Sequence, residues 1–199
     1  MTMDYVVDSQ GVKYQCKFLG REGMIAEVDK LERGHSSNIV IPSEINGPAS
    51  MIAGKYKVVS VGQWAFSDSD TLRSVELPDS ISEIHINAFE NCVSLISVKI
   101  PNGVKKIGSE AFRKCKSLKA ITLPDCLEEI EESTFEFCEN LEYVRIGDFT
   151  QHVDEKAFRN CYKLREVTWR WHKGRSDNAQ LSRELRAAVP ILCLRTDYE

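Results

Sequence analysis

Four cysteines recur at a fixed interval of 23 residues, at Cys92, Cys115, Cys138 and Cys161. Thiols in a row could bind a metal ion, form disulfides or carry out redox chemistry. The chain has no C-x-x-C pair, which zinc ribbons and thioredoxin-like sites use. Ser69 stands in the same place one interval earlier, so the position favours a small buried side chain over a reactive one. We therefore expect a structural row without metal or cofactor, whereas Cys126 lies outside the row and is expected to be exposed.

A second row places oxygen-bearing side chains directly after a Pro or Gly, at Asp79, Asn102, Asp125 and Asp148. Stacked carboxylates could attract Ca²⁺, which is a hard cation that binds oxygen ligands. However, Pro-Asp and Pro-Asn are also good turn sequences, and the chain has no glycine-rich calcium-binding loop. The row is interpreted as turn chemistry, and no metal site is predicted.

Other signs of catalysis are missing from the sequence. The four histidines have no metal-ligand spacing, and there is no G-x-S-x-G, phosphate-binding glycine loop or dinucleotide fingerprint. The net charge of −4 argues against nucleic acid as a partner. No apolar run reaches the roughly 20 residues that span a bilayer, and the start MTMDYVVDSQ does not read as a signal peptide. The sequence therefore predicts neither an enzyme nor membrane insertion.

The cysteines belong to a longer repeat, marked by pairs 23 residues apart at Ala65-Phe66, Ala88-Phe89, Ala111-Phe112, Thr134-Phe135 and Ala157-Phe158. Within each unit, L-x-x-V-x-I alternates at period two and predicts a short strand, which the following Pro ends. The A-F-x-x-C-x-x-L segment has apolar residues three apart and predicts one tight helical turn. V-x-x-I-G predicts a second extended piece. Because one unit cannot bury its own apolar side, stacked units are expected, with each Phe, Leu and Val resting on its counterpart.

This pattern divides the chain into three parts. Residues 1–57 are expected to form an N-terminal β cap with a hairpin at Ser9-Gln10-Gly11, and residues 58–169 form five repeat units. Residues 170–199 are expected to form a C-terminal cap. There, DNAQLSRELRAAV predicts a helix with Asp177 and Gln180 as a capping box, and ILCL predicts a final strand.

The unit A-F-x-x-C-x-x-L-x-x-V-x-I-P-x-x-V-x-x-I-G resembles the BspA-like leucine-rich repeat, which is mostly bacterial, over residues 58–169. The resemblance implies an α/β solenoid: a right-handed leucine-rich-repeat coil with a parallel sheet on one face. It also implies a surface or secreted protein that binds host proteins or other cells. The absence of a visible signal sequence favours the alternative, a cytoplasmic scaffold of the same fold.

The outward positions of the predicted strands are expected to form one continuous surface, the usual binding face of a solenoid. The candidate partner-binding residues are Arg73, Glu76, Ile96, Lys99, Lys119, Thr122, Glu142, Tyr143, Arg145, Arg165 and Trp171. Their charges are mixed in sign, so a strongly charged ligand is not implied. Ile96, Tyr143 and Trp171 could anchor a protein, because aromatic and apolar residues concentrate binding energy. The predicted function is a non-enzymatic protein-binding module, with the ligand and the oligomeric state left open.

Overall fold

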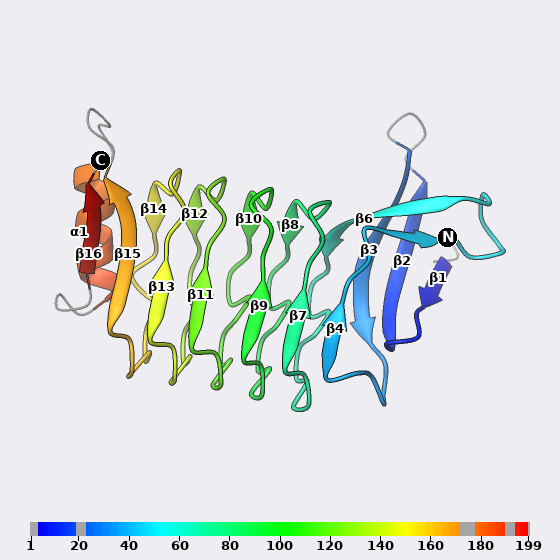
Figure 1. Cartoon of the computed structure of the whole chain (residues 1–199), viewed down its shortest axis with the longest axis horizontal. Coiled ribbons are helices and arrows are strands. Elements are labelled where there is room, and N and C mark those ends of the chain that lie inside the picture. Colours follow the sequence, from blue (N-terminus) through cyan, green and yellow to red (C-terminus); the bar gives the residue numbers. More distant parts are fainter. Residues whose placement is uncertain (1–3, 19–22, 172–177, 190–193, 199) are drawn as a thin grey trace.

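Repeated coils stack along the long axis of the molecule, between a group of longer strands at one end and a helix at the other (Figure 1). The computed structural model describes residues 4–18, 23–171, 178–189 and 194–198. Within these residues, no helix combines the length and the apolar character needed to cross a membrane.

The N-terminal end is a meander of three strands, β1 (Asp4–Val7), β2 (Val12–Phe18) and β3 (Met24–Leu31). β1 and β2 pair antiparallel around Ser9-Gln10-Gly11, which confirms the predicted hairpin. The turn requires a glycine at its end, since Gly11 has φ +82° and a Cβ there would lie 2.9 Å from the His35 Cα.

Three further strands follow this meander along the chain and lead into the repeats. β6 (Lys55–Val61) lies parallel to β3 and antiparallel to the short β5 (Glu44–Asn46). β4 (Asn38–Val40) pairs with the first repeat strand. The side chain of Gln10 lies along the outer edge of β4: its amide donates to the Val40 carbonyl and accepts from the Val40 N–H, each at 2.8 Å. It therefore occupies backbone groups that an added strand would otherwise use.

The repeat strands form two rows. The first row contains β7 (Ser74–Glu76), β9 (Ser97–Lys99), β11 (Ala120–Thr122), β13 (Tyr143–Arg145) and β15 (Glu166–Trp171). The second row contains the two-residue strands β8 (Glu83–Ile84), β10 (Lys106–Ile107), β12 (Glu129–Ile130) and β14 (His152–Val153). Parallel register advances by one repeat per step, for example from Val75 to Val98 and from Val144 to Val167.

The strands of each row do not make one sheet, although a single parallel sheet on one face was expected from the sequence. The first row is divided into the sheets β4-β7-β9 and β11-β13-β15-β16. The second row is divided in the same way, with β10 ending one sheet and β12 beginning the next. Both divisions fall at the same step between coils.

The A-F-x-x-C-x-x-L segments are successive β-turns, so the predicted helical turn is wrong. In one coil the Ala88 N–H donates to His85 (3.3 Å) and the Cys92 N–H to Phe89 (3.2 Å). Asn87 and Asn91 have φ of 56° and 58°, a left-handed conformation that a helix does not contain. The apolar spacing of three, which suggested a helix, comes from two such turns placed end to end.

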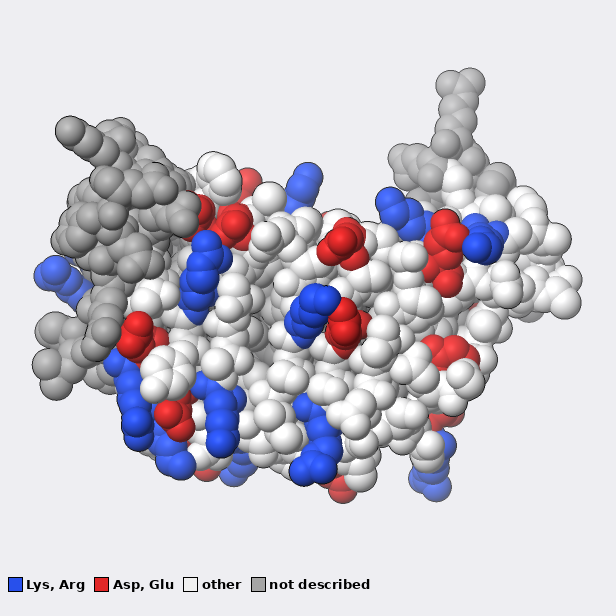
Figure 2. Space-filling view, viewed as in Figure 1, with Lys and Arg blue, Asp and Glu red and all other residues white. Residues whose placement is uncertain are grey.

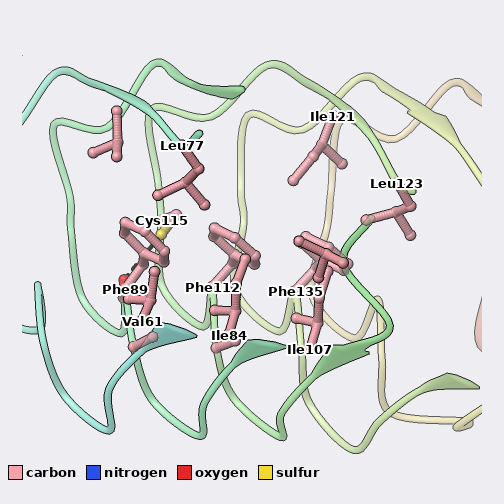
Figure 3. Close-up of a cluster of buried hydrophobic side chains, with 14 of the residues drawn as sticks. Val61, Leu77, Ile84, Phe89, Ile107, Phe112, Cys115, Ile121, Leu123 and Phe135 are labelled. Atoms are coloured by element: carbon pink, nitrogen blue, oxygen red, sulfur yellow. Dashed lines mark hydrogen bonds between the residues drawn. The ribbon is translucent and has the colours of Figure 1, made fainter. Parts of the chain in front are cut away.

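The predicted stacking of like residues is confirmed. The rings of Phe66, Phe89, Phe112, Phe135 and Phe158 lie parallel, with centroids 4.7–5.5 Å apart and interplanar angles of 2–6°. Figure 3 shows the rings of Phe89, Phe112 and Phe135, with Leu77, Ile121 and Leu123 on one side and Val61, Ile84 and Ile107 on the other. All are buried, and burial of apolar surface at about 25 cal/mol per Å² is the main force that joins the coils.

The C-terminal end carries the predicted helix, α1 (Asn178–Ala188), followed by β16 (Leu194–Tyr198), which lies parallel to β15. The predicted apolar face of α1, at Leu181, Leu185, Ala188 and Val189, is buried. Asp177 of the proposed capping box and residues 191–193 of the predicted strand fall outside the described residues.

Candidate functional site

The sheet face is defined here as the outward side chains of the first-row strands, together with the residue before each strand. Arg73, Glu76, Ile96, Lys99, Lys119, Thr122, Tyr143 and Arg165 are exposed, whereas Glu142 and Arg145 are partly buried. Figure 2 looks onto this side, where basic and acidic side chains are interspersed among uncharged surface. The side chain of Trp171 lies outside the part of the chain that the structure describes, although its backbone continues β15.

On the N-terminal half of the face, the ammonium of Lys99 pairs with the Glu76 carboxylate one strand away. This hydrogen bond raises the pKa of Lys99 above its ordinary value. Ile96 lies nearby with 45% of its surface exposed. This half therefore presents a neutralised ion pair beside an apolar side chain.

On the C-terminal half, a shallow hollow of about 140 Å³ opens between β11, β13 and β15. It is lined by Ala120, Ile121, Thr122, Tyr143, Val144, Arg145, Glu166 and Thr168. The hollow forms because β11 presents the small Ala120 next to Tyr143, its partner in the parallel register. Tyr143 stands at its edge with 47% of its surface exposed, as an aromatic side chain beside a recess.

Arg145 is held in place by two carboxylates of the acidic turn row. Its Nη1 lies 2.9 Å from Asp125 Oδ1, and its Nη2 lies 3.2 Å from Asp148 Oδ1. These two carboxylates therefore form charge-assisted hydrogen bonds with a guanidinium. Among the described residues, no three His, Cys, Asp or Glu side chains are grouped so that they could hold a metal ion.

The cysteine row is buried, and each thiol donates to a Phe carbonyl of the preceding coil. The Sγ–O distances are 3.0 Å from Cys92 to Phe66, 3.2 Å from Cys115 to Phe89, 3.1 Å from Cys138 to Phe112 and 3.1 Å from Cys161 to Phe135. Burial raises the pKa of the Cys92 and Cys161 thiols to about 12. Such thiols are poor nucleophiles at neutral pH, in agreement with the structural role predicted for the row. Cys126 is exposed, as predicted.

The sequence identified residues that lie on the sheet face, but it did not predict the shape of that surface. The hollow and the Asp125–Arg145–Asp148 clamp were not foreseen. The sequence does contain a signal for the clamp. Asp125 and Asp148 are one repeat apart and therefore lie side by side, and Asp148 follows Arg145 by three residues. The hollow has a weaker signal, namely the small side chain of Ala120 where the next unit has Tyr143.

Comparisons with known proteins agree with this architecture. A model of the BspA type leucine-rich repeat region matches residues 49–165, in six copies. The leucine-rich repeat protein of T. pallidum is 29% identical with a TM-score of 0.67, over 81% of this chain and 70% of that chain. No protein of curated function matches.

Two further solved structures share the fold at lower identity. A leucine-rich repeat protein from Bacteroides capillosus is 23% identical with a TM-score of 0.60, over 83% of this chain and 98% of that one. A leucine-rich cell surface protein from Faecalibacterium prausnitzii is 22% identical with a TM-score of 0.54, over 85% of this chain. The match covers 55% of that second protein, so this chain spans about half of its length.

Proposed function

Since the chain belongs to the BspA-type leucine-rich repeat family, we propose that it is a non-enzymatic module that binds a protein through its sheet face. The observation that carries this proposal is the hollow between β11, β13 and β15, with the exposed Tyr143 at its edge. A recess beside a tyrosine can receive an apolar side chain of a partner while the phenol bonds to its backbone. Arg145, already held by two carboxylates, is fixed in position before a ligand arrives.

The other candidate residues form the rest of the proposed binding surface around and beyond this hollow. Ile96 offers an apolar contact on the other half of the face, and Glu76 with Lys99 contributes a neutral pair. Arg165 lies 3.8 Å from Glu142, so this charge is also balanced. A surface of balanced charges suits a partner without strong net charge, as the sequence indicated.

We propose that the protein acts at a bacterial cell surface or is secreted, and its similarity to the cell surface protein of Faecalibacterium prausnitzii supports this. The alternative is a scaffold inside the cell, which the unpaired, buried cysteines favour. We also propose that residues 1–57 and 170–199 cap a repeat region at 58–169. The Gln10 amide on the β4 edge and the apolar face of α1 support this role.

Capture followed by a single substitution tests the proposal. The purified chain is used to capture proteins from extracts of its own cells and of host cells, and the affinity of each captured protein is then measured. Tyr143→Ala is expected to weaken binding at least about tenfold, as loss of an aromatic anchor does, while the melting temperature stays nearly unchanged. Trp64→Ala is the matched control, because Trp64 is exposed by 55% but lies in a turn outside the sheet face. Equal affinity of Tyr143→Ala and Trp64→Ala would place the binding site elsewhere.

A further inference from the structure

Backbone hydrogen bonds between neighbouring coils recur at the same positions along the sheet face, but they are absent between the coils that carry β9 and β11. The bond that follows each strand runs from Leu77 N–H to the Lys99 carbonyl (3.1 Å), from Leu123 to Arg145 (2.8 Å) and from Ile146 to Thr168 (2.8 Å). The equivalent bond from Ile100 to Thr122 is absent, although both residues are described.

The bond that precedes each strand shows the same interruption. It runs from Ile96 N–H to the Arg73 carbonyl (2.8 Å), from Glu142 to Lys119 (2.8 Å) and from Arg165 to Glu142 (2.9 Å). Its equivalent from Lys119 to Ile96 does not form, and no ladder joins β9 to β11.

The second row of strands is interrupted at that step as well. Lys105 N–H donates to Ser82 (2.9 Å) and Gln151 to Glu128 (2.7 Å), yet Glu128 does not donate to Lys105. Gly108 donates to Ile84 (2.9 Å) and Asp154 to Ile130 (3.0 Å), yet Glu131 does not donate to Ile107. Four separate series of bonds thus stop between the same two coils, within the described stretch 23–171. We call this step the seam.

The turns hold the two coils together across the seam. Phe89 N–H donates to the Ala111 carbonyl at 2.7 Å, and Asn91 N–H donates to Arg113 at 2.8 Å. The Phe89 and Phe112 rings remain stacked, with centroids 5.0 Å apart. Arg113 Nη1 also reaches back to Glu90 Oε1 at 2.8 Å. The row of turns is therefore continuous where both rows of strands are not.

Among the described residues, side-chain hydrogen bonds and ion pairs cross the seam beside the second row and not beside the first. The Glu131 carboxylate accepts from the Ser109 N–H (2.8 Å) and from its hydroxyl (2.9 Å). On the sheet face, Lys99 pairs back toward Glu76, away from the seam. Val98 and Ile100 are only partly buried there, whereas their counterparts Val75, Leu77, Ile121 and Leu123 are buried. The seam is thus least restrained on the sheet face.

We propose that the seam is a hinge. The coils that carry β4, β7 and β9 move against those that carry β11, β13 and β15, about the continuous row of turns, and the sheet face changes its curvature. We infer that this motion fits the sheet face to a bound protein, which rests on the proposed function. The motion itself does not depend on that function. Packed elements with an intact backbone ladder resist such movement, because each bond would have to break.

Amide exchange and NMR relaxation of the ligand-free full chain test the hinge. The amides of Ile100, Lys119, Glu128 and Glu131 are expected to exchange at least about 100-fold faster than their counterparts Leu77, Glu142, Gln151 and Asp154. Relaxation dispersion on the microsecond-to-millisecond scale is expected at Val98, Ile100 and Lys119, with flat profiles at Leu77 and Glu142.

Glu131→Ala sharpens the test, since it removes the side-chain bridge to Ser109 and should enlarge the dispersion at Ile100 and Lys119. Glu128→Ala is the control: it removes an exposed neighbouring side chain that is not part of the Glu131–Ser109 bridge, and it should leave the dispersion unchanged. Slow exchange at the seam would mean that the ladder is intact, and fast exchange with flat dispersion would mean a static gap. Either result overturns the hinge and leaves protein binding by the sheet face untouched.

Discussion

The row of turns and the sheet face come from the same coils, yet only the row of turns is bonded at every repeat step. In the turns, the residues with left-handed φ lie four apart, such as Glu110 and Lys114. Their own N–H groups, and that of Phe112 midway between them, donate to carbonyls of the next coil. Buried Phe rings and thiols then add contacts between the same coils. The first-row strands β7, β9, β11 and β13 contribute three residues each, and their pairing depends on close approach of their backbones. Contacts made by large side chains tolerate small displacements between coils, whereas strand ladders do not.

The continuity of the turns is kept despite backbone strain. Glu110, Lys114 and Phe137 have φ of 58°, 59° and 60°, where Asn and Gly are the favoured residues. Such conformations persist when surrounding contacts fix them. Here the contacts are the inter-coil hydrogen bonds and the buried Phe–Cys packing on the inner side of the turn.

The largest expected effect comes from breaking the row of turns. Phe112→Ala should lower the free energy of unfolding by about 3–5 kcal/mol, because it leaves a cavity in a fully buried stack. Denaturant titration measures the change. Phe149→Ala is the matched control, since this ring is 59% exposed, and its loss should stay below about 1 kcal/mol. Similar losses for both variants would show that the stacked rings do not form the core.

A smaller effect is expected at Gly147, where the backbones of two neighbouring coils lie close together. A Cβ at Gly147 would overlap the Pro124 carbonyl oxygen, so Gly147→Ala should destabilise the protein by about 1–3 kcal/mol through a forced backbone shift. Gly103→Ala is its control, because the added Cβ would lie 3.7 Å from the nearest atom, an ordinary contact. If Gly147→Ala unfolds at the same denaturant concentration as Gly103→Ala, the coils after the seam are not closely packed.

The smallest expected effect concerns α1, which packs on β14. Burial raises the pKa of Glu184, but hydrogen bonds from Gln180 (2.9 Å), the Val153 N–H (2.9 Å) and His152 (3.4 Å) lower it more. The pKa therefore lies below the ordinary glutamate value of 4.5. Since the folded state favours the charged form, its stabilising contribution is present above that value and is lost as the pH falls through the folded pKa.

Thermal unfolding of the wild type and Glu184→Gln at several pH values measures this contribution. The wild type should be the more stable at neutral pH, and the difference should shrink in acid. Glu129, His152, Asp154, Glu155 and Arg183 line the pocket around Glu184 and are present in both proteins, so the two proteins differ only in the Glu184 carboxyl. A difference that is constant with pH would show that the carboxylate does not fasten the helix to the last repeat.

Some features followed from residue type and spacing alone. The 23-residue period placed Phe, Leu and Cys in stacked buried columns, because identical units that cannot bury their apolar sides separately must do so together. The hairpin at Gly11 and the apolar face of α1 also followed from local signals. The candidate face residues could be named because alternate positions of a strand point to opposite sides.

Other features needed the tertiary structure. Apolar spacing of three suits both a helical turn and a pair of β-turns, and only the inter-coil bonds of the A-F segments select the turns. The hollow at Tyr143 and the clamp on Arg145 depend on which residues of neighbouring coils meet. The seam could not be predicted from the 23-residue repeat, because the repeated Phe, Leu and Cys positions continue across it without interruption. A repeated sequence determines which side chains are buried, but the distance between two backbones is decided by how whole coils pack.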